Sequence, residues 1–371
     1  MNAPSPLLTR PGAVRATGPD EGVAAHYGHP VAEQRALERG IGVVDLSHLG
    51  VVTVSGPDRL SWLNTLSSQV LTELAPGAST ELLLLDPNGR IEHAAAVLDD
   101  GERAWLITEG AAAQPLAAFL DSMRFMLRVD VTHEASIAVL GTSAAGPDLS
   151  GLVPAGHAAA LTWTDPWPHT PAGSTRYGPE DADHPGSQWH ARLTLVAQEA
   201  VEGVVSAAES AGARLAGAWA WEAMRVAAWR PRLAREVDER TIPHELDWLR
   251  TAVHLNKGCY RGQETIARVF NLGRPPRRLV LLHLDGSEHT TPEPGEEVHS
   301  GDRTVGRVTS VVRHHELGPV ALALVKRNLA SDAPLTVAGI AAAQEVIVSP
   351  EGAGTGRPEA APGPTLRRRN L

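Results

Sequence analysis

The chain has 371 residues, of which 43% are hydrophobic, so it is long enough for two or three domains with buried cores. Its net charge of −10 argues against sequence-independent binding to nucleic acid, since attraction to phosphates needs positive charge. The single cysteine excludes an internal disulfide, and it excludes a four-cysteine metal or iron–sulfur site built within one chain.

The first part of the chain predicts alternating helices and strands behind a disordered tail. Residues 1–20 are rich in Pro, Gly and Ala without periodicity, so we predict no fixed structure there. Gly40 ends the first short helix, and DPNG forms the turn of a hairpin. Predicted helices cover 31–39, 56–70 and 113–127, and predicted strands cover 51–56, the hairpin 80–98, 103–108 and 130–141.

The second part predicts loops, three more helices and an all-β end. Residues 142–190 are rich in Gly, Pro, Asp and His and are interpreted as irregular strands and loops, while the charged segment 230–249 is interpreted mostly as loop. A strand is predicted at 189–197, helices are predicted at 199–212, 217–230 and 264–271, and a small barrel is predicted at 277–350. Low-complexity residues 351–371 are predicted to be disordered.

The only cysteine stands in the segment KGCYRGQE, residues 257–264. Lys257 and Arg261 flank Cys259, and the free N–H groups of the helix predicted behind it add positive potential, so the setting favours the thiolate. The glycines allow close approach of a ligand to the backbone. We interpret Cys259 as a reactive thiol; the alternative is a small buried side chain beside a helix start, with both cations facing solvent.

Other motifs point to no additional chemistry. The sequence contains no P-loop, HExxH or dinucleotide fingerprint. His314 and His315 are adjacent, so on a strand they face opposite sides and cannot both bind one ion, and we predict no metal site. The apolar runs are too short to span a membrane and the start lacks the apolar stretch of a signal peptide, so we expect a cytoplasmic protein that contacts no membrane.

KGCYRGQE resembles the signature of the YgfZ-type folate-binding proteins, a branch of the superfamily that includes the glycine-cleavage aminomethyltransferase. DERTIPHEL at 238–246, residues 42–66, and the C-terminal GRVTSVV and GPVALALVKRNL are similar to other parts of that superfamily. The resemblance covers roughly residues 25–350. It implies an α+β cloverleaf: two lobes within 21–276 and a C-terminal β-barrel at 277–350 surround a central channel that binds tetrahydrofolate.

The resemblance also implies a function. Members of this branch are accessory proteins for assembly or repair of iron–sulfur clusters in client enzymes, including enzymes that modify tRNA, so Cys259 would be the reacting group and no direct contact with nucleic acid is expected. The alternative is a folate-dependent aminomethyltransferase or demethylase using Glu92, which stands in NGRIEHAAAV where aminomethyltransferases carry an aspartate. A third possibility is a scaffold protein in which folate only stabilises the fold.

The folate-site residues that the resemblance implies are Arg225, Lys257, Tyr260, Gln263 and, for the pterin, Glu180. A guanidinium suits a folate carboxylate, but Arg225 is also interpretable as a surface arginine on an amphipathic helix. Further candidates for the anionic tail are Arg230, Arg232, Arg274, Arg277 and Arg278, although RPPRR is better interpreted as a solvated linker. Candidates for stacking on the pterin are Trp62, Trp221 and Trp229, with the protein core as their alternative place.

Overall fold

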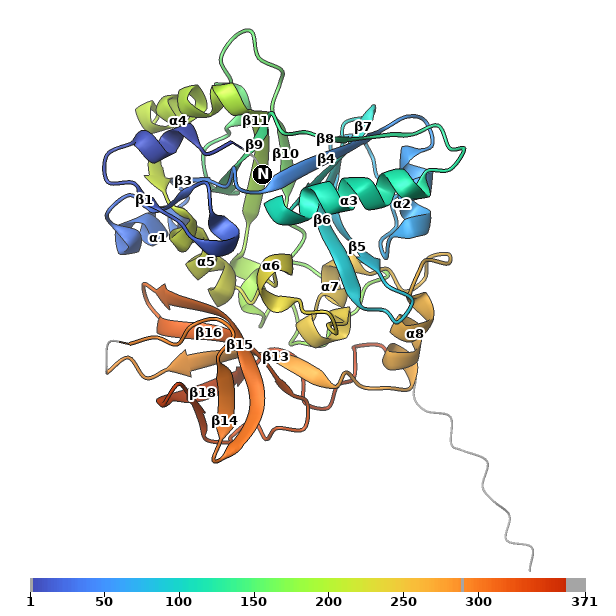
Figure 1. Cartoon of the computed structure of the whole chain (residues 1–371), viewed down its shortest axis with the longest axis vertical. Helices are drawn as coiled ribbons and strands as arrows, with labels where there is room; N and C mark the ends of the chain where they lie inside the picture. Colours follow the sequence, from blue (N-terminus) through green and yellow to red (C-terminus); the bar gives the residue numbers. More distant parts are fainter. Residues whose placement is uncertain (1–2, 288–289, 358–371) are drawn as a thin grey trace, which may run out of the picture.

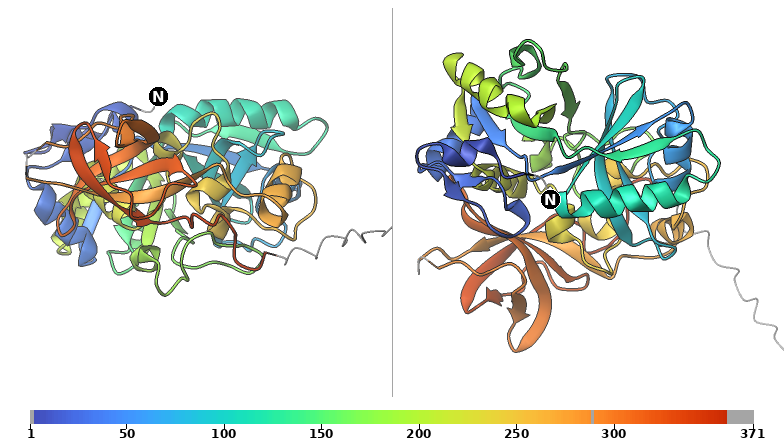
Figure 2. Two further views of the ribbon diagram at one scale, coloured as in Figure 1. Left: turned by 90° about the horizontal axis from the view of Figure 1, so that it is seen from below. Right: turned by 45° about the horizontal axis from the view of Figure 1, so that its top comes forward.

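The protein has three parts, two α+β lobes and a C-terminal β-barrel, which meet around a common centre (Figure 1). The structure is a computed structural model that describes residues 3–287 and 290–357. Seen from a second direction the molecule is thinner, because the parts lie side by side (Figure 2). This arrangement confirms the predicted α+β class with a closed barrel at the C-terminal end. Within the described residues, no helix combines the length and the apolar character needed to cross a membrane.

The first lobe is built on a five-stranded sheet in the order β10-β11-β9-β3-β12. Its strands are β3 (Gly42–Asp45), β9 (Ile137–Ser143), β10 (Leu161–Thr164), β11 (Ala191–Ala197) and β12 (Arg214–Ala216), and its helices are α1 (Pro30–Glu38), α4 (Val201–Ser210) and α5 (Ala218–Ala227). In α4, Val201, Val204, Val205 and Ala208 recur at helical spacing and are buried. They pack on sheet residues such as Val43, so α4 covers one face of the sheet.

The second lobe is an insertion between β3 and β9, and its sheet has the order β5-β6-β7-β4-β8. Its strands are β4 (Gly50–Ser55), β5 (Ser79–Leu85), β6 (Ile91–Asp99), β7 (Arg103–Thr108) and β8 (Asp130–His133), and its helices are α2 (Arg59–Leu66) and α3 (Gly110–Met123). Ala113, Leu116 and Leu120 of α3 form a buried stripe that packs on the sheet. The opposite face of this sheet is therefore free to meet the first lobe.

The two sheets pack against each other directly. Leu98 and Ile107 of the second lobe share one buried cluster with Val44 and Val139 of the first lobe. The indole N–H of Trp163 also donates to the carbonyl oxygen of Thr80 at 2.6 Å. The contact between the lobes is thus both apolar and hydrogen-bonded.

The C-terminal barrel closes because β13 pairs with β16 on one side and with β18 on the other. Its strands are β13 (Arg277–Leu284), β14 (Glu297–Ser300), β15 (Arg303–His314), β16 (Gly318–Lys326), β17 (Leu335–Val337) and β18 (Ile340–Val346). Val280 and Leu282 point into the barrel core, whereas Leu279 and Leu281 belong to a cluster shared with the lobes. A strand buried on both faces explains the continuous apolar run RLVLLHL.

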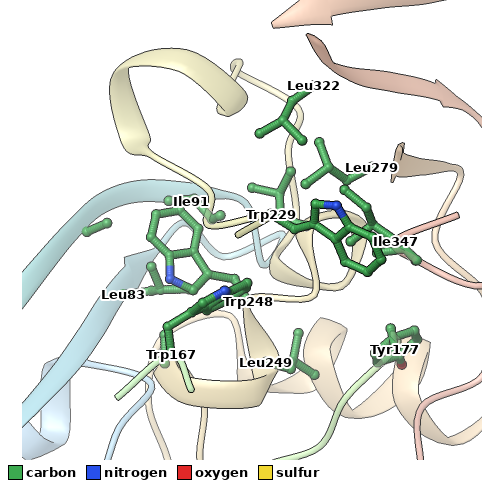
Figure 3. Close-up of a cluster of buried hydrophobic side chains, with 14 of the residues drawn as sticks. Leu83, Ile91, Trp167, Tyr177, Trp229, Trp248, Leu249, Leu279, Leu322 and Ile347 are labelled. Carbon is green, nitrogen blue, oxygen red and sulfur yellow. The ribbon is translucent and has the colours of Figure 1, made fainter. Parts of the chain in front are cut away.

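A cluster of large side chains fills the junction of the three parts (Figure 3). Leu83 and Ile91 come from the second lobe, Leu279 and Leu322 from the barrel, and the tryptophans from the connecting segments. These tryptophans are Trp167, Trp189, Trp229 and Trp248. The irregular stretch 142–190 therefore contributes to the core, although it contains little regular structure.

The termini are more ordered than the sequence predicts. Leu7 is fully buried against α4, and β1 (Val14–Arg15) pairs with β2 (Ala24–His26), so the prediction of disorder is wrong for residues 3–20. At the other end, the N–H of Thr355 donates to the carbonyl of Arg176 at 2.9 Å, so residues 351–357 also pack. Residues 1–2 and 358–371 lie outside the described part of the chain. In the N-terminal segment, turns that contain Pro and Gly surround one buried apolar residue, Leu7.

The segment 230–249 is charged but not a surface loop. It contains the short α6 (Leu233–Glu236), and α7 (Leu249–Ala252) follows it. His244, Glu245 and Asp247 within it are fully buried. Helix α8 (Gln263–Asn271) begins within one residue of its prediction, whereas α3 ends at Met123 rather than at 127.

We expect His244 to make the protein sensitive to acid. Its side chain is fully buried, and this burial lowers its pKa to about 3. Below about pH 6.5 the unfolded chain binds a proton that the folded protein does not, so stability falls as the pH falls. At pH 5 this loss is about 2 kcal/mol for one histidine. Urea unfolding at pH 7 and pH 5 measures it.

His244→Phe is expected to lose about 2 kcal/mol less than the unmodified protein over this pH range. The matched control is His283→Asn, because His283 is a partly exposed histidine beside Glu345 on the barrel surface. An equal pH dependence in His244→Phe and the unmodified protein would contradict the assignment.

Candidate functional site

A cavity of about 140 Å³ lies where the two sheets and α5 meet. Its walls include Ala94 and Ala96 of β6, Trp221 of α5, and Glu81 of β5. Glu81 and Ala96 are opposite each other in the β5–β6 ladder, which places both on the face turned toward the first lobe. The cavity therefore combines apolar walls with several charged side chains.

Arg230, Glu81 and Asp165 form a buried charged group in the cavity wall. Arg230 donates from Nη2 to Glu81 Oε2 at 2.7 Å and from Nε to Asp165 Oδ2 at 3.0 Å. The indole N–H groups of Trp248 and Trp189 donate to Glu81 Oε2 and Asp165 Oδ2 at 3.0 and 2.8 Å. Glu81 Oε1 and Arg230 Nη1 are buried without a hydrogen-bond partner among the described residues. One acceptor oxygen and one donor nitrogen of this group thus have no partner in the described part of the chain.

Aromatic rings hold the Arg230 guanidinium in place. Its central carbon lies 5.0 Å from the Trp167 ring centre and 5.8 Å from that of Trp248. Burial alone would lower the pKa of Arg230, but the carboxylates of Asp165 and Glu81 raise it. Arg230 is therefore a fixed cation inside the cavity wall.

Arg225 is at the centre of a second buried network. Nε and Nη2 donate to the two oxygens of Glu222, and Nη1 donates to Glu236 Oε2 and to the carbonyl of Arg230. The remaining Nη2 donor reaches Ser310 Oγ of the barrel at 2.8 Å. All five guanidinium donors are used, and the residue is only 3% exposed. The interpretation as a surface arginine is wrong, and a folate role for Arg225 stays a prediction.

Arg232 extends this network to the N-terminal segment. It donates to Asp20 Oδ1 at 2.6 Å and to both oxygens of Glu109 at 2.7 and 2.8 Å. Asp20 also lines the cavity. Burial alone would raise the pKa of Glu222, but Arg225 and Arg232 hold it below its usual value. The segment predicted to be disordered is thus part of the cavity wall.

The cysteine segment is held in place by three side chains that contact other parts of the protein, those of Lys257, Tyr260 and Gln263. Lys257 Nζ donates to the carbonyl oxygens of Asn64 at 2.6 Å, Ser67 at 2.6 Å and Gln69 at 2.7 Å, which caps the end of α2. Burial lowers the pKa of Lys257 to about 8. All three N–H donors of this ammonium group bind backbone carbonyl oxygens, so ligand binding by Lys257 stays a prediction.

The other two predicted contacts in this segment also face the protein. Tyr260 is buried in the cluster at the junction of the three parts, and burial raises its pKa. The Gln263 side chain donates to the carbonyl of Lys257 at 3.2 Å and closes the loop around Cys259. None of the three lines the cavity.

Cys259 itself is exposed, so the alternative of a buried hydrophobic thiol is wrong. Gly262, which precedes α8, has φ +83°, and a side chain there would meet the carbonyl oxygen of Asp86. The turn therefore depends on glycine. It presents the thiol to solvent outside the cavity.

Glu92 lies beside the cysteine segment rather than in the cavity. In the β5–β6 ladder Leu84 faces His93 and Leu85 faces Ile91, so Glu92 is the extra residue of a β-bulge. Its carboxylate pairs with Arg261 at 2.8 Å, with both side chains partly exposed. The structure thus brings Glu92 and Arg261 together, and a catalytic role for Glu92 stays a prediction.

The remaining predicted contacts are dispersed. Glu180 is exposed, pairs with Arg176 at 2.9 Å and does not line the cavity. Trp221 lines the cavity, whereas Trp62 packs inside the second lobe and Trp229 in the junction cluster.

The cations of the linker RPPRR are not all solvated. Arg277 binds Glu245 at 2.8 Å, and Arg278 is fully buried and donates to Gln344 at 2.7 Å.

The sequence interpretation missed Glu81, Asp165 and Trp248. Glu81 carried a usable signal, because a carboxylate at the start of the apolar run ELLLL needs a partner once the strand is buried. Asp165 and Trp248 lie in irregular segments where no periodicity marks a buried position. Only the structure shows their roles: Asp165 accepts a hydrogen bond from Arg230, and Trp248 donates one to Glu81.

Two domains of one family match the chain. Residues 23–149 match the GCVT N-terminal domain, and residues 277–350 match the glycine cleavage T-protein C-terminal barrel domain. An aminomethyltransferase of Thermus thermophilus is 30% identical over 296 residues, covering 76% of this chain and 79% of that protein. A putative chloroplastic transferase of Arabidopsis thaliana is 26% identical over 331 residues, covering 84% of this chain and 71% of that protein.

The fold is also found in a solved structure. The glycine cleavage system aminomethyltransferase T of Bartonella henselae superposes with a TM-score of 0.71 at 17% identity, covering 94% of this chain and 97% of that one. The order of lobes and barrel is therefore that of this fold. The chain belongs to the glycine cleavage T-protein family, the family of the aminomethyltransferases.

Proposed function

We propose that this protein binds tetrahydrofolate in its central cavity and serves as an accessory protein for assembly or repair of iron–sulfur clusters in client enzymes. The observation that carries this proposal is the exposure of Cys259 on a glycine-dependent turn outside the cavity. A thiol in this position reaches a partner protein without entering the folate site. The YgfZ-like segment KGCYRGQE supports the same reading.

The cavity wall suits a pterin ring. The edge of a pterin carries N–H donors beside a carbonyl acceptor, and Glu81 Oε1 and Arg230 Nη1 are a buried acceptor and donor without partners in the described chain. Trp221 and Trp189 offer aromatic surface beside them. The volume of about 140 Å³ is smaller than a typical pocket for a whole ligand, so we assign the cavity to the ring system.

The thiol supplies the proposed reactivity. One cysteine per chain cannot hold a cluster alone, so Cys259 would act as a transient ligand of a cluster in transit or as a thiol in exchange with a client. The cluster is cargo of the client enzyme in this proposal. Enzymes that insert sulfur into tRNA are the client class that the family resemblance suggests.

A second candidate is a folate-dependent aminomethyltransferase, which the names of several relatives favour. This function needs a carboxylate beside the bound folate. Glu92 is the nearest sequence match, but its side chain pairs with Arg261 at the surface and does not line the cavity. Glu81 and Asp165 do line the cavity, but both carboxylates are paired with Arg230, so the exposed Cys259 thiol is the observation that favours the accessory function.

Complementation tests the proposal. In a strain that lacks this protein, Cys259→Ser is expected to restore less than about a tenth of the activity of a sulfur-inserting cluster enzyme, because a hydroxyl does not replace a thiolate ligand. Asn256→Ala is the matched control, since Asn256 is an exposed residue of the same loop, and it should restore full activity. Full rescue by Cys259→Ser would refute the thiol role. Methylene-tetrahydrofolate formation from a methylated amine would favour the transferase instead.

A further inference from the structure

A second set of polar side chains lies outside the cavity, where α1 of the first lobe meets the turn between β15 and β16. Gln34 of α1 joins these elements through two hydrogen bonds. Its Nε2 donates to the carbonyl of Arg313 at 2.9 Å, and its Oε1 accepts from the N–H of His315 at 2.8 Å. The Gln34 side chain therefore fixes the backbone of His315 relative to α1.

Three possible metal ligands converge at this point. Glu38, His315 and Glu316 each offer one ligand atom, and these atoms lie within 4.8 Å of one another. His315 Nε2 is already 3.1 Å from Glu38 Oε2. The His315 side chain is only 2% exposed, whereas that of Glu38 is 45% exposed. The buried imidazole of His315 is thus fixed in position, whereas the exposed carboxylates of Glu38 and Glu316 can change conformation.

A metal at His315 Nε2 would replace the contact of this nitrogen with Glu38, which is itself one of the three candidate ligands. His315 Nδ1 is buried and has no partner among the described residues, whereas Nε2 lies 3.1 Å from Glu38 Oε2, so binding of a metal at Nε2 requires the ring proton to be on Nδ1. His314 does not compete, because its Nδ1 accepts from the N–H groups of Glu316 and Leu317. These bonds order the turn that carries Glu316.

We propose that Glu38, His315 and Glu316 bind a divalent transition metal ion of the Zn²⁺ class. One imidazole and two carboxylates are common ligands of Zn²⁺, and three protein ligands leave a fourth position for water. The sequence argument against a metal site concerned the two adjacent histidines as joint ligands, whereas this site uses only one of them. Because Glu38 belongs to a lobe and the other ligands to the barrel, the ion would fasten two parts of the molecule together. This site is independent of the folate cavity.

The test is calorimetric titration of the chelator-treated full chain with ZnCl₂, in a Cys259→Ser background that removes the only thiol. We expect a saturable site whose affinity falls at least about tenfold in Glu38→Gln and in Glu316→Gln. Zn²⁺ at about 100 times its Kd should also raise Tm by about 3 °C, and either glutamine variant should lose this shift.

Glu345→Gln is the matched control, because Glu345 pairs with His283 at 2.9 Å on the barrel surface but lies outside the Glu38–His315–Glu316 group. It should leave Zn²⁺ affinity and the Tm shift unchanged. The proposal is overturned by an absence of saturable binding. It is overturned equally if Glu38→Gln and Glu316→Gln bind Zn²⁺ as tightly as the parent, because the ion then sits elsewhere.

Discussion

Arg225→Met is expected to lower the free energy of unfolding by about 3–5 kcal/mol. The change removes a guanidinium from between Glu222 and Glu236, both buried, so that Glu236 loses its ion pair with Arg225 and Glu222 keeps only Arg232 as a cation. It also breaks the hydrogen bond to Ser310, which ties α5 to the barrel. Denaturant unfolding at neutral pH gives the value directly.

Arg268→Met is the matched control, since Arg268 forms an ion pair of the same length with Glu264 on the surface of α8. A surface pair contributes about 0–1 kcal/mol, so this variant should unfold almost as the parent does. Similar small losses in both variants would contradict the view that the Arg225 network holds lobe and barrel together. Loss of stability in Arg225→Met could be mistaken for loss of folate binding. Folate binding by this variant must therefore be measured on its folded fraction.

Local patterns were sufficient to predict most regular elements. The turn DPNG was expected to join two strands, and in the structure Asp86 accepts hydrogen bonds from the N–H groups of Asn88 and Arg90 between β5 and β6. A helix was likewise predicted at 199–212, and the structure has α4 at Val201–Ser210. Both signals act within a few residues, so the sequence alone carries them.

Long-range pairing was beyond the reach of such patterns. Arg225 was interpreted as a folate contact or as a surface arginine, but its partners Glu236 and Ser310 lie 11 and 85 residues further along the chain. Leu7 shows the same limit at the N-terminus, where one apolar residue among prolines is enough to anchor a segment to α4. Composition predicts disorder there because it does not register a single buried contact.

The candidate site was predicted in its parts but not in its arrangement. The resemblance implied folate contacts at Lys257, Tyr260 and Gln263 next to Cys259, whereas in the structure this segment does not line the cavity. The β-bulge at Glu92 accounts for part of this separation, because it turns one carboxylate toward Arg261. Tyr260 connects the two places, since it follows Cys259 and packs in the same cluster as Trp248.

Glu81→Gln is expected to weaken tetrahydrofolate binding by about 10- to 100-fold. The amide keeps the shape of the side chain but removes the charge that would accept hydrogen bonds from the pterin edge in the proposed site. It also leaves Arg230 with Asp165 as its only carboxylate partner among the described residues. Anaerobic calorimetric titration with tetrahydrofolate measures the Kd. A Tm measurement on the same sample shows whether the variant is folded during the titration.

Glu180→Gln is the control that separates the structural assignment from the sequence assignment. Glu180 was the sequence candidate for the pterin, but it is an exposed residue paired with Arg176 and lies outside the cavity lining. Its glutamine variant should bind tetrahydrofolate within about twofold of the parent, because a surface ion pair contributes about 0–1 kcal/mol. If Glu180→Gln loses binding while folded Glu81→Gln retains it, the ligand occupies the loop after Tyr177 and the cavity is not the folate site. Loss in Glu81→Gln alone places the pterin between the two lobes, where Arg230 supplies the complementary donor.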